Sequence, residues 1–266
     1  MSKPTQDLIA RYKTELAGIT ELVEPSMHVF AHVCERQTAA GIKGDMLEIG
    51  VFRAGTASLL AACLAPEHRI FLIDPFQNEA VNRQTIERFA KVKPAQLMFQ
   101  ITDSIMVNKW RERMLSPHVP LIRFAHIDGE HSYDGVYSDL QLAQRYLAPG
   151  GLIVLDDIFN MNSACCTHAL FDYLRDNPLI HCVAMGYRKA YLCESRWLGF
   201  YRKFFLETPD LLGAAGIHVR LCFNAWAHER SYVTFDDCGA DEPHYQIIGR
   251  RFNTLKEALG TLDHIS

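Results

Sequence analysis

The segment 45–56, Asp-Met-Leu-Glu-Ile-Gly-Val-Phe-Arg-Ala-Gly-Thr, restricts the fold more than any other part of the chain. Its apolar run Met46–Ile49 predicts a short buried strand, Gly50 predicts a tight turn, and Gly55-Thr56 predicts the start of a helix. A strand, a glycine turn and a helix in this order begin a doubly wound α/β sheet, in which ligands bind beyond the carboxyl ends of the strands. The segment therefore predicts both a fold class and the edge of the sheet at which a ligand binds.

The spacing of the two glycines indicates that the turn does not suit a dinucleotide. A dinucleotide fingerprint needs a glycine where the backbone approaches a pyrophosphate, and Phe52 occupies that position here. Glu48 instead places an acid just before the turn, which suits a ligand with a cationic amino-acid end. An NAD-dependent oxidoreductase is disfavoured for this reason.

Polar side chains end each strand that is predicted after this first unit. The apolar runs are Ile70–Ile73, Leu97–Ile101, Leu121–Ile127 and Leu152–Leu155. They are followed by Asp74, by Thr102-Asp103-Ser104, by Asp128 and by the pair Asp156-Asp157. Because strands and helices alternate along this stretch, a parallel sheet is expected, and these side chains should gather at its ligand-binding edge.

Composition excludes several other classes of protein. The 266 residues are 48% hydrophobic and 22% charged, as in an ordinary soluble domain with a large core. The net charge of −4 and the pI near 6.3 argue against a nucleic-acid partner, because such proteins carry basic patches. The sequence has no apolar run long enough to span a membrane and no signal peptide at its start. We therefore expect a cytoplasmic protein, whose eight cysteines are reduced thiols rather than zinc ligands.

The order of the motifs resembles that of class I S-adenosylmethionine (SAM)-dependent methyltransferases. The motifs are Glu48-Ile-Gly-x-x-x-x-Gly-Thr56, Ile73-Asp-Pro75, Thr102-Asp-Ser104, Ile127-Asp-Gly-Glu-His-Ser-Tyr133 and Gly150-Gly-Leu-Ile-Val-Leu-Asp-Asp157. Within this class the chain is most similar to the metal-dependent macrocin or sugar O-methyltransferases, distant relatives of catechol O-methyltransferase. The resemblance covers about residues 40–195. It implies a Rossmann-like, mostly parallel sheet of seven strands, the last of them antiparallel.

Three segments are expected around this sheet. Residues 1–42 should form helices packed on the sheet or over the cofactor mouth, and residues 43–194 the SAM-binding domain, with a turn at Pro149-Gly-Gly151. Residues 195–266 should form an α+β extension. Its aromatic stripe, Trp197 to Phe205, has helical spacing and is predicted to pack and to contribute a homo-oligomer contact. The extension's loops near Trp226–Tyr232 are expected to lie close to the acceptor.

The resemblance also assigns the cofactor residues. Glu48 and Gly50 should bracket the methionine moiety of SAM, with Phe52, Gly55 and Thr56 completing the loop. Asp74 should bind the ribose hydroxyls. Asp103, Ser104 and Asp128 are also assigned to the cofactor, the first two beside the adenine, and Phe76 either lines the adenosine or packs.

The acids after the fourth and fifth strands predict a metal site. Neighbouring strands lie about 4.8 Å apart, so Asp128, Asp156 and Asp157 should converge, and no Lys or Arg directly flanks them in sequence. Several anions in one pocket repel each other unless a cation sits among them, and a site of oxygen ligands suits Mg²⁺. The resemblance implies the same ligand set. The alternative is that these aspartates only cap the segments that follow.

His131 and Asp128 are the predicted catalytic residues. Methyl transfer needs an acceptor oxygen that loses its proton, and a histidine can accept a proton near neutral pH. The alternative is that His131 only holds the loop; Tyr133 and His126 are secondary candidates, and His126 is expected to pack in its strand. The sequence therefore predicts a Mg²⁺-dependent SAM O-methyltransferase acting on a small hydroxylated acceptor such as a sugar. The alternatives are a metal-independent or nitrogen-directed methyltransferase and a non-catalytic SAM-binding protein.

Overall fold

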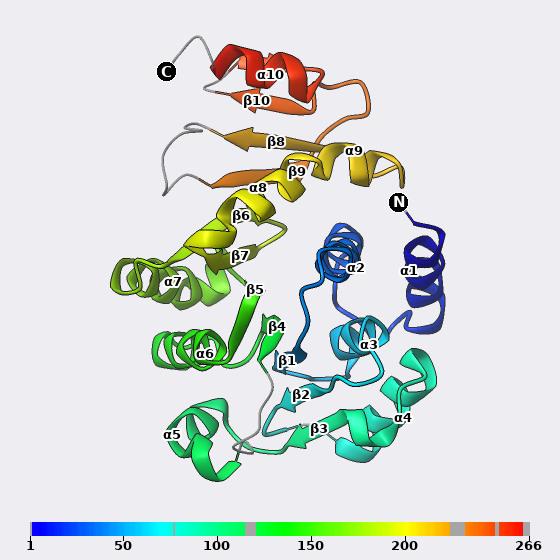
Figure 1. Ribbon diagram of the computed structural model, residues 1–266, viewed down its shortest axis with the longest axis vertical. Coiled ribbons are helices and arrows are strands. Elements are labelled where there is room, and N and C mark those ends of the chain that lie inside the picture. The colour runs from blue at the N-terminus through cyan, green and yellow to red at the C-terminus, as the bar shows by residue number, and fades with distance from the viewer. Residues whose placement is uncertain (1, 77, 115–120, 224–231, 248–249, 263–266) are drawn as a thin grey trace.

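The computed structural model describes residues 2–76, 78–114, 121–223, 232–247 and 250–262. One sheet of eleven strands runs through this part of the chain, in the order β11-β10-β8-β9-β6-β7-β5-β4-β1-β2-β3 (Figure 1). The first seven strands are β1 (Asp45–Ile49), β2 (Ile70–Ile73), β3 (Leu97–Gln100), β4 (Ile122–Ile127), β5 (Leu147–Leu155), β6 (Ile180–Gly186) and β7 (Lys189–Glu194). The remaining strands are β8 (Val219–Phe223), β9 (Val233–Asp237), β10 (Tyr245–Ile247) and β11 (Arg250–Phe252).

Helices connect these strands and precede the first one. They are α1 (Lys3–Glu15), α2 (Glu24–Ala39), α3 (Gly55–Ala62), α4 (Glu79–Ala90), α5 (Ser104–Met114), α6 (Tyr133–Arg145), α7 (Ala164–Asp176), α8 (Leu198–Leu206), α9 (Thr208–Gly213) and α10 (Leu255–Leu262). Three short 3-10 turns are η1 (Pro94–Gln96), η2 (Met161–Ser163) and η3 (Ser195–Trp197). Among the described residues, no helix is both long enough and apolar enough to cross a membrane.

The strands β1 to β7 confirm the predicted doubly wound sheet. Strands β3, β2, β1, β4 and β5 pair in parallel, whereas β7 runs antiparallel to both β5 and β6. Helices α1 to α4 cover one face of the sheet and α5 to α7 cover the other (Figure 1). Because both faces are covered, β1, β2 and β4 are buried along their whole length.

Successive side chains of each strand enter different cores, as the pleat of a strand requires. Met46 joins the apolar cluster beneath α1 to α4, and Leu47 joins the cluster beneath α5 to α7. The same alternation places Phe124 in the first cluster and Ala125 in the second. The face beneath α1 to α4 therefore receives Glu48 from β1 and His126 from β4, which are direct partners in the register of these strands.

The predicted turn at Pro149-Gly-Gly151 is wrong. These residues lie inside β5, which starts at Leu147. They form a bulge, because Ile122 of β4 pairs with Leu147 while Phe124 already pairs with Leu152. Gly150 has φ +83°, and a Cβ on Gly151 would lie 2.7 Å from the Ile122 carbonyl oxygen. The two glycines therefore allow a bulge inside the strand. The same residues have the composition of a turn, which is why the sequence pattern predicted one.

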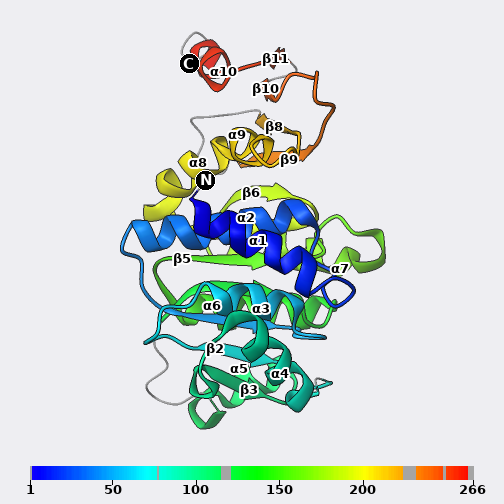
Figure 2. The same ribbon diagram turned by 90° about the vertical axis from the view of Figure 1, so that its right-hand side faces the viewer.

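The C-terminal extension continues the sheet rather than forming a separate layer. Strand β9 pairs in parallel with β6, and β8, β10 and β11 follow beyond it at the far end of the molecule (Figure 2). A capping box is present at the start of α10. There the backbone amide of Glu257 donates to the Thr254 hydroxyl at 3.3 Å, and the Thr254 amide donates to the Glu257 carboxylate at 3.2 Å.

Most of the aromatic stripe belongs to the core. Tyr201, Phe204 and Phe205 are at most 2% exposed, and Trp197 and Phe200 are partly buried against the same cluster. The stripe therefore packs within the chain, as expected, and little of it remains for a contact between subunits. Self-association stays a prediction. Of the loop expected near the acceptor, residues 224–231 lie outside the described residues.

Candidate active site

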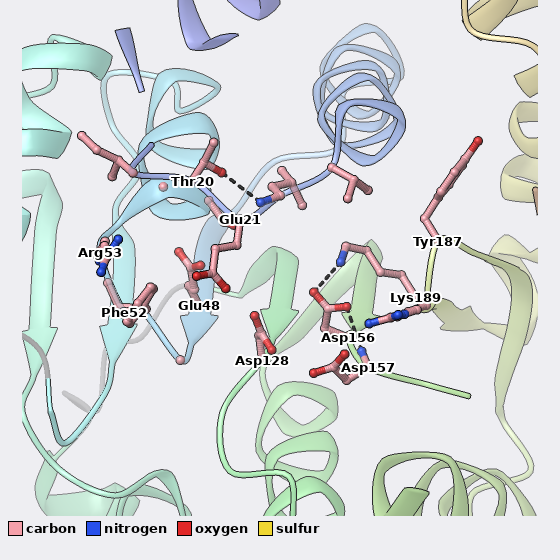
Figure 3. Close-up of a pocket in the computed structure, with 18 of the residues that line it drawn as sticks. Thr20, Glu21, Glu48, Phe52, Arg53, Asp128, Asp156, Asp157, Tyr187 and Lys189 are labelled. Carbon is pink, nitrogen blue, oxygen red and sulfur yellow. Dashed lines mark hydrogen bonds and ion pairs between the residues drawn. The ribbon is translucent and has the colours of Figure 1, made fainter. Parts of the chain in front are cut away.

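Two adjoining cavities lie along the carboxyl ends of β1, β2, β4 and β5. Their volumes are about 540 and 590 Å³, and both are lined by Gly50, Phe52, Asp128 and His131. The first cavity extends toward β7 and is shown in Figure 3. The second extends toward β2 and the segment after β3. Together they form one elongated cleft at the edge where the sequence predicted a ligand.

The second cavity gathers the residues predicted to bind adenosine. It is lined by Asp74, Phe76, Asp103 and Ser104. Phe76 is 94% exposed, so its ring is free to cover a ligand rather than packed in the core. These four residues come from the ends of two strands, which explains how positions 30 residues apart reach one cavity.

Asp74 also holds the turn that follows β1. One of its carboxylate oxygens accepts from the backbone amides of Val51 and Phe52 at 2.9 and 2.8 Å, and the other accepts from the Phe76 amide at 2.7 Å. A carboxylate offers about four acceptor sites, so one position stays open for a further donor. The residue therefore shapes the cavity as well as lining it.

Gly50 brings the turn against the end of β4. Its φ is +85°, and a Cβ at this position would lie 1.8 Å from the Asp128 carbonyl oxygen. Only glycine fits this approach. The close contact between the two strand ends is what places Glu48, Gly50 and Asp128 around one cleft.

The connection between α1 and α2 forms the roof of the first cavity. Ile19 to Val23 line it, and Thr20 anchors this loop through hydrogen bonds with the Tyr12 hydroxyl at 2.6 Å and the Leu22 amide at 3.0 Å. A Cβ on Gly55 would come within 2.7 Å of the Thr20 Cα. Gly55 and Thr56 line the same cavity, so this glycine serves the roof of the cleft in addition to the start of α3.

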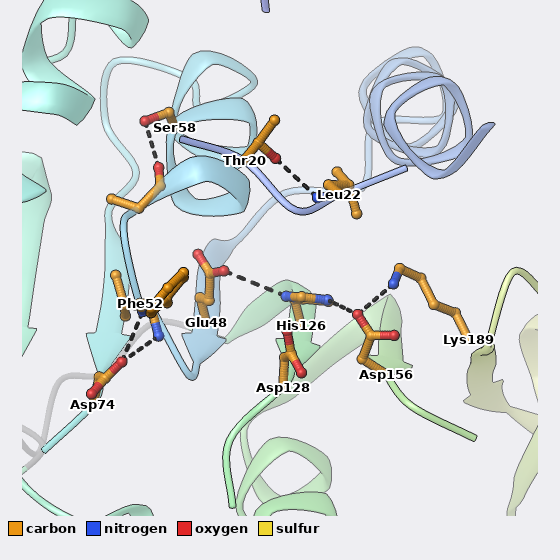
Figure 4. Close-up of polar contacts among 12 residues, drawn as sticks. Thr20, Leu22, Glu48, Phe52, Ser58, Asp74, His126, Asp128, Asp156 and Lys189 are labelled. Carbon is orange, nitrogen blue, oxygen red and sulfur yellow. Dashed lines mark hydrogen bonds and ion pairs between the residues drawn. The ribbon is translucent and has the colours of Figure 1, made fainter. Parts of the chain in front are cut away.

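A row of four ionisable side chains crosses the floor of the first cavity (Figure 4). Glu48 and Asp156 flank His126 with nitrogen–oxygen distances of 3.5 Å on each side, which are ion pairs rather than short hydrogen bonds. The Lys189 ammonium forms an ion pair with the Asp156 carboxylate and so ends the row. Glu48, His126 and Lys189 belong to β1, β4 and β7, and Asp156 directly follows β5. The pleat directs all four side chains to the face beneath α1 to α4.

Burial and charge together set the ionisation of this row. Burial raises the pKa of Glu48 to about 7, although His126 offsets part of the effect. Burial alone would lower the pKa of His126, but Asp156 and Glu48 on its two sides raise it to about 9. For Asp156 the same competition gives a lowered pKa, because His126 and Lys189 outweigh its burial. The floor thus holds an ionised Asp156 between two cations.

His131 lies beside the other two aspartates. Its Nε2 is 3.2 Å from Asp157 Oδ2 and 3.5 Å from Asp128 Oδ1, while its Nδ1 is 3.0 Å from the Ser163 hydroxyl. The hydrogen bond with Asp128 raises the pKa of His131, and the charge of Asp157 adds to this effect. His131 and Asp128 are each about 40% exposed, so an incoming molecule can reach both.

The residues predicted to bind a metal divide into two groups. Ligand atoms of Asp128, Asp157 and His131 lie within 4.8 Å of one another, and so do those of Asp128, His126 and Asp156. The first group is open to the cavity and fits a divalent cation, because two carboxylates and one imidazole match its usual ligands. In the second group Asp156 already faces two protein cations.

Sequence reasoning missed Lys189 and underrated His126. Lys189 lies 33 residues after Asp156 and is 5% exposed, so no local motif links the two. One signal was available: Lys189 has the same parity as Tyr191, so the pleat places both on one face of β7. His126 is buried as expected, but between two acids rather than among apolar side chains.

Backbone conformations that non-glycine residues rarely adopt gather around the first cavity. Of the residues that line it, Phe52, Asp157, Tyr187 and Arg188 have φ between +46° and +61°. Such conformations cost energy and persist where the surrounding structure enforces them, often at functional sites. Here they form the β1 turn, the end of β5 and the turn between β6 and β7.

This strand order and a cleft lined by acids at the strand ends are those of a class I SAM-dependent methyltransferase fold. Residues 47–158 match the family model described as a methyltransferase domain, and this segment runs from within β1 to beyond the end of β5 and contains every predicted site residue. The chain therefore contains a methyltransferase domain.

Several solved structures share this fold at low sequence identity. The O-methyltransferase NovP is 15% identical, with a TM-score of 0.53 over 66% of this chain and 82% of that one. The O-methyltransferase from Bacillus cereus in complex with S-adenosylhomocysteine (SAH) is 15% identical, with a TM-score of 0.51 over 72% and 90%. The O-methyltransferase TomG from Streptomyces achromogenes, in complex with SAM, is 15% identical, with a TM-score of 0.50 over 72% and 89%. A comparison with curated proteins gives no match.

Proposed function

We propose that this methyltransferase transfers the methyl group of SAM to a hydroxyl oxygen of a small molecule, such as a sugar or another natural-product acceptor. The observation that carries the proposal is the position of His131 with Asp128 and Asp157, in the cavity that adjoins the predicted adenosine site. Three solved structures that share the fold are named O-methyltransferases, which favours oxygen over nitrogen as the methylated atom.

The reaction needs one base and one methyl-donating substrate. The acceptor oxygen forms a bond to the methyl carbon, the carbon–sulfur bond breaks, and its electron pair stays on sulfur to give SAH. The hydroxyl proton passes to His131 Nε2. Glu48 and Gly50 are proposed to hold the methionine end of SAM, Asp74 the ribose, and Phe76, Asp103 and Ser104 the adenosine side.

His131 can accept this proton only after one of its present contacts is replaced. Both ring nitrogens face protein groups, Ser163 on one side and the two aspartates on the other. An acceptor hydroxyl that enters between His131 and Asp157 meets the ring at Nε2. Because the two carboxylates raise the pKa of His131, its neutral form should predominate only above the ordinary value of about 6.5.

A divalent cation is proposed at Asp128 and Asp157, with His131 nearby. When bound there, Mg²⁺ would lower the pKa of the acceptor hydroxyl. Asp156 is less suited to this role than the sequence predicted, because its carboxylate is engaged by Lys189 and His126. Its proposed role is to hold these two cations at the floor of the cavity.

A metal-independent methyltransferase is the second candidate function. It is favoured by Lys189, whose ammonium lies at the cavity floor where the sequence offered no cation. In that case Lys189 and His126 would supply the positive charge that the aspartates require, and the divalent site would be dispensable.

Two binding measurements test these proposals without an acceptor. Calorimetry should detect SAH binding to the wild type and no NAD binding. Electron paramagnetic resonance with Mn²⁺ as the probe should detect one bound ion, lost in Asp157→Ala and Asp128→Ala. Lys189→Met serves as the matched control that changes the floor and leaves both ligands in place. Absence of SAH binding would refute the function, and an Asp157→Ala variant that still binds Mn²⁺ would refute the ligand set.

A further inference from the structure

The turn between β6 and β7 forms one wall of the first cavity. Tyr187 and Arg188 connect the two strands directly, and both have positive φ, +50° and +61°. Two-residue hairpin turns of this kind favour Asn and Gly, because larger side chains are strained there. A tyrosine and an arginine in such conformations persist where the surrounding structure enforces them, which is common at functional sites.

Contacts from two other parts of the chain hold this turn in place. The Arg188 carbonyl oxygen accepts from the Ile158 amide at 2.9 Å, which ties the turn to the loop after β5. The Tyr187 hydroxyl donates to Asp237 at 2.6 Å, and the Tyr187 ring meets Phe235 edge-on at 5.7 Å. Asp237 and Phe235 belong to β9 of the C-terminal extension.

The extension approaches the turn as closely as the backbone allows. Gly186 pairs with Phe235, and a Cβ on Gly186 would lie 2.6 Å from the Phe235 carbonyl oxygen. The absence of a side chain at Gly186 is therefore required for β9 to pack here. The extension is built against the cavity wall and not merely attached to the end of the sheet.

The basic side chains of this cavity differ in whether they have a carboxylate partner. Lys189 is buried and paired with Asp156. Arg53 is exposed over the Phe52 ring at 4.8 Å, on the side of the cavity opposite Tyr187 (Figure 3). Arg188 is exposed at the rim, and within the described part of the chain its guanidinium has no carboxylate partner.

We propose that Arg188 binds an anionic group of the acceptor, a carboxylate or a phosphate, and that the extension positions Arg188 through Tyr187. This inference rests on the proposed function. A guanidinium binds either anion through two parallel hydrogen bonds, which a lysine cannot reproduce. The Glu48 and Asp156 carboxylates lie on the floor of the cavity and Arg188 lies at its rim, so the acceptor spans the cavity, with its hydroxyl toward His131 and its anion toward solvent.

The test compares matched ligands on SAH-saturated protein, where no transfer occurs. One pair is glucose 1-phosphate and glucose, and the other is 3,4-dihydroxybenzoate and catechol. We expect calorimetry to show at least one anionic ligand binding about tenfold or more tightly than its neutral partner, the effect of one charge-assisted contact. The pair that shows the preference identifies the anion as phosphate or carboxylate.

Four variants locate the origin of this preference. Arg188→Ala should abolish it, and Arg188→Lys should keep part of it. Arg53→Ala, the matched control on the opposite side of the cavity, should leave it unchanged. Tyr187→Phe, which keeps the ring and removes only the hydroxyl, should reduce the ratio of the two affinities while SAH binding stays within about twofold. A role in folding alone would lower stability without changing that ratio.

The inference would be overturned if neither pair showed a preference for its anionic ligand, or if no ligand bound. It would also be overturned if the preference survived in Arg188→Ala, or if Arg53→Ala abolished the preference as well. An unchanged ratio in Tyr187→Phe would remove the positioning role of the extension. Each of these results can occur with normal SAH binding, whereas failure of the proposed function appears as absent SAH binding in the wild type.

Discussion

Asp139 should make the free energy of unfolding depend on pH, and replacing it with asparagine should remove that dependence. The side chain lies on α6 beneath Ser104 and is fully buried. Among the described residues, neither carboxylate oxygen makes a hydrogen bond of ordinary geometry, although the Ser104 hydroxyl is near enough to offset part of the cost. Burial raises the pKa of Asp139 to about 7.

The sign and size of the effect follow from this pKa. The folded protein holds the proton more tightly than the unfolded chain, so the stabilising contribution is complete below the unfolded pKa of 3.8. It is lost as the pH rises to about 7. At 1.36 kcal/mol for each pKa unit, the loss amounts to about 4 kcal/mol. Asparagine has a similar shape and no charge, so Asp139→Asn should gain this amount relative to the wild type.

Urea unfolding of both proteins between about pH 4 and pH 8 measures this difference. The gain in Asp139→Asn should be small at the acidic end and should reach about 4 kcal/mol at the alkaline end. Asp134→Asn is the matched control, because Asp134 is exposed on the same helix. A difference between Asp139→Asn and the wild type that stays constant with pH would refute the reasoning.

Three further substitutions test contacts around the cleft. Asp74→Ala should weaken SAH binding by about 1.5–3 kcal/mol in calorimetry, and equal affinity would remove Asp74 from the cofactor site. Lys189→Met should lower stability by about 3 kcal/mol, because it leaves Asp156 buried with one cation fewer. The double variant Lys189→Met with Asp156→Leu should recover most of this loss in urea unfolding; no recovery would show that the pair does not account for it. Gly186→Ala should cost about 1–3 kcal/mol by displacing β9, and unchanged stability would contradict the close approach.

The fold was largely predictable because parallel strands covered on both faces leave a strong sequence signal. The run Ile70–Ile73 was predicted with its observed bounds, and so was the β1 turn at Gly50, whereas the antiparallel β7 was expected only from the family resemblance. The bulge in β5 was not, because Pro149-Gly-Gly151 has the composition of a turn whether the chain leaves the sheet or only deviates within it. The pairing of β9 with β6 was not predictable either, since periodicity identifies a strand and not its neighbour.

The candidate site was predictable where it depends on strand ends and not where it depends on packing between distant segments. Acids after apolar runs located the edge of the sheet at which the cleft lies. The pairing of Lys189 with Asp156 arises from strands that are distant in sequence. The same holds for the roof formed by Thr20, which lies before the first strand. Burial was also an insufficient guide to His126, because both its faces meet acids inside the core.

The most direct test of the proposed oxygen methylation is transfer from methyl-labelled SAM to a panel of hydroxylated acceptors, carboxylated and phosphorylated members included, followed by mass spectrometry of the products. We expect a product with one labelled methyl group on a hydroxyl oxygen. Formation of this product should fall about 10²–10⁴-fold in His131→Ala, the usual effect of losing a general base, while SAH affinity is preserved. A product methylated on nitrogen, or one that His131→Ala forms as fast as the wild type, would contradict it.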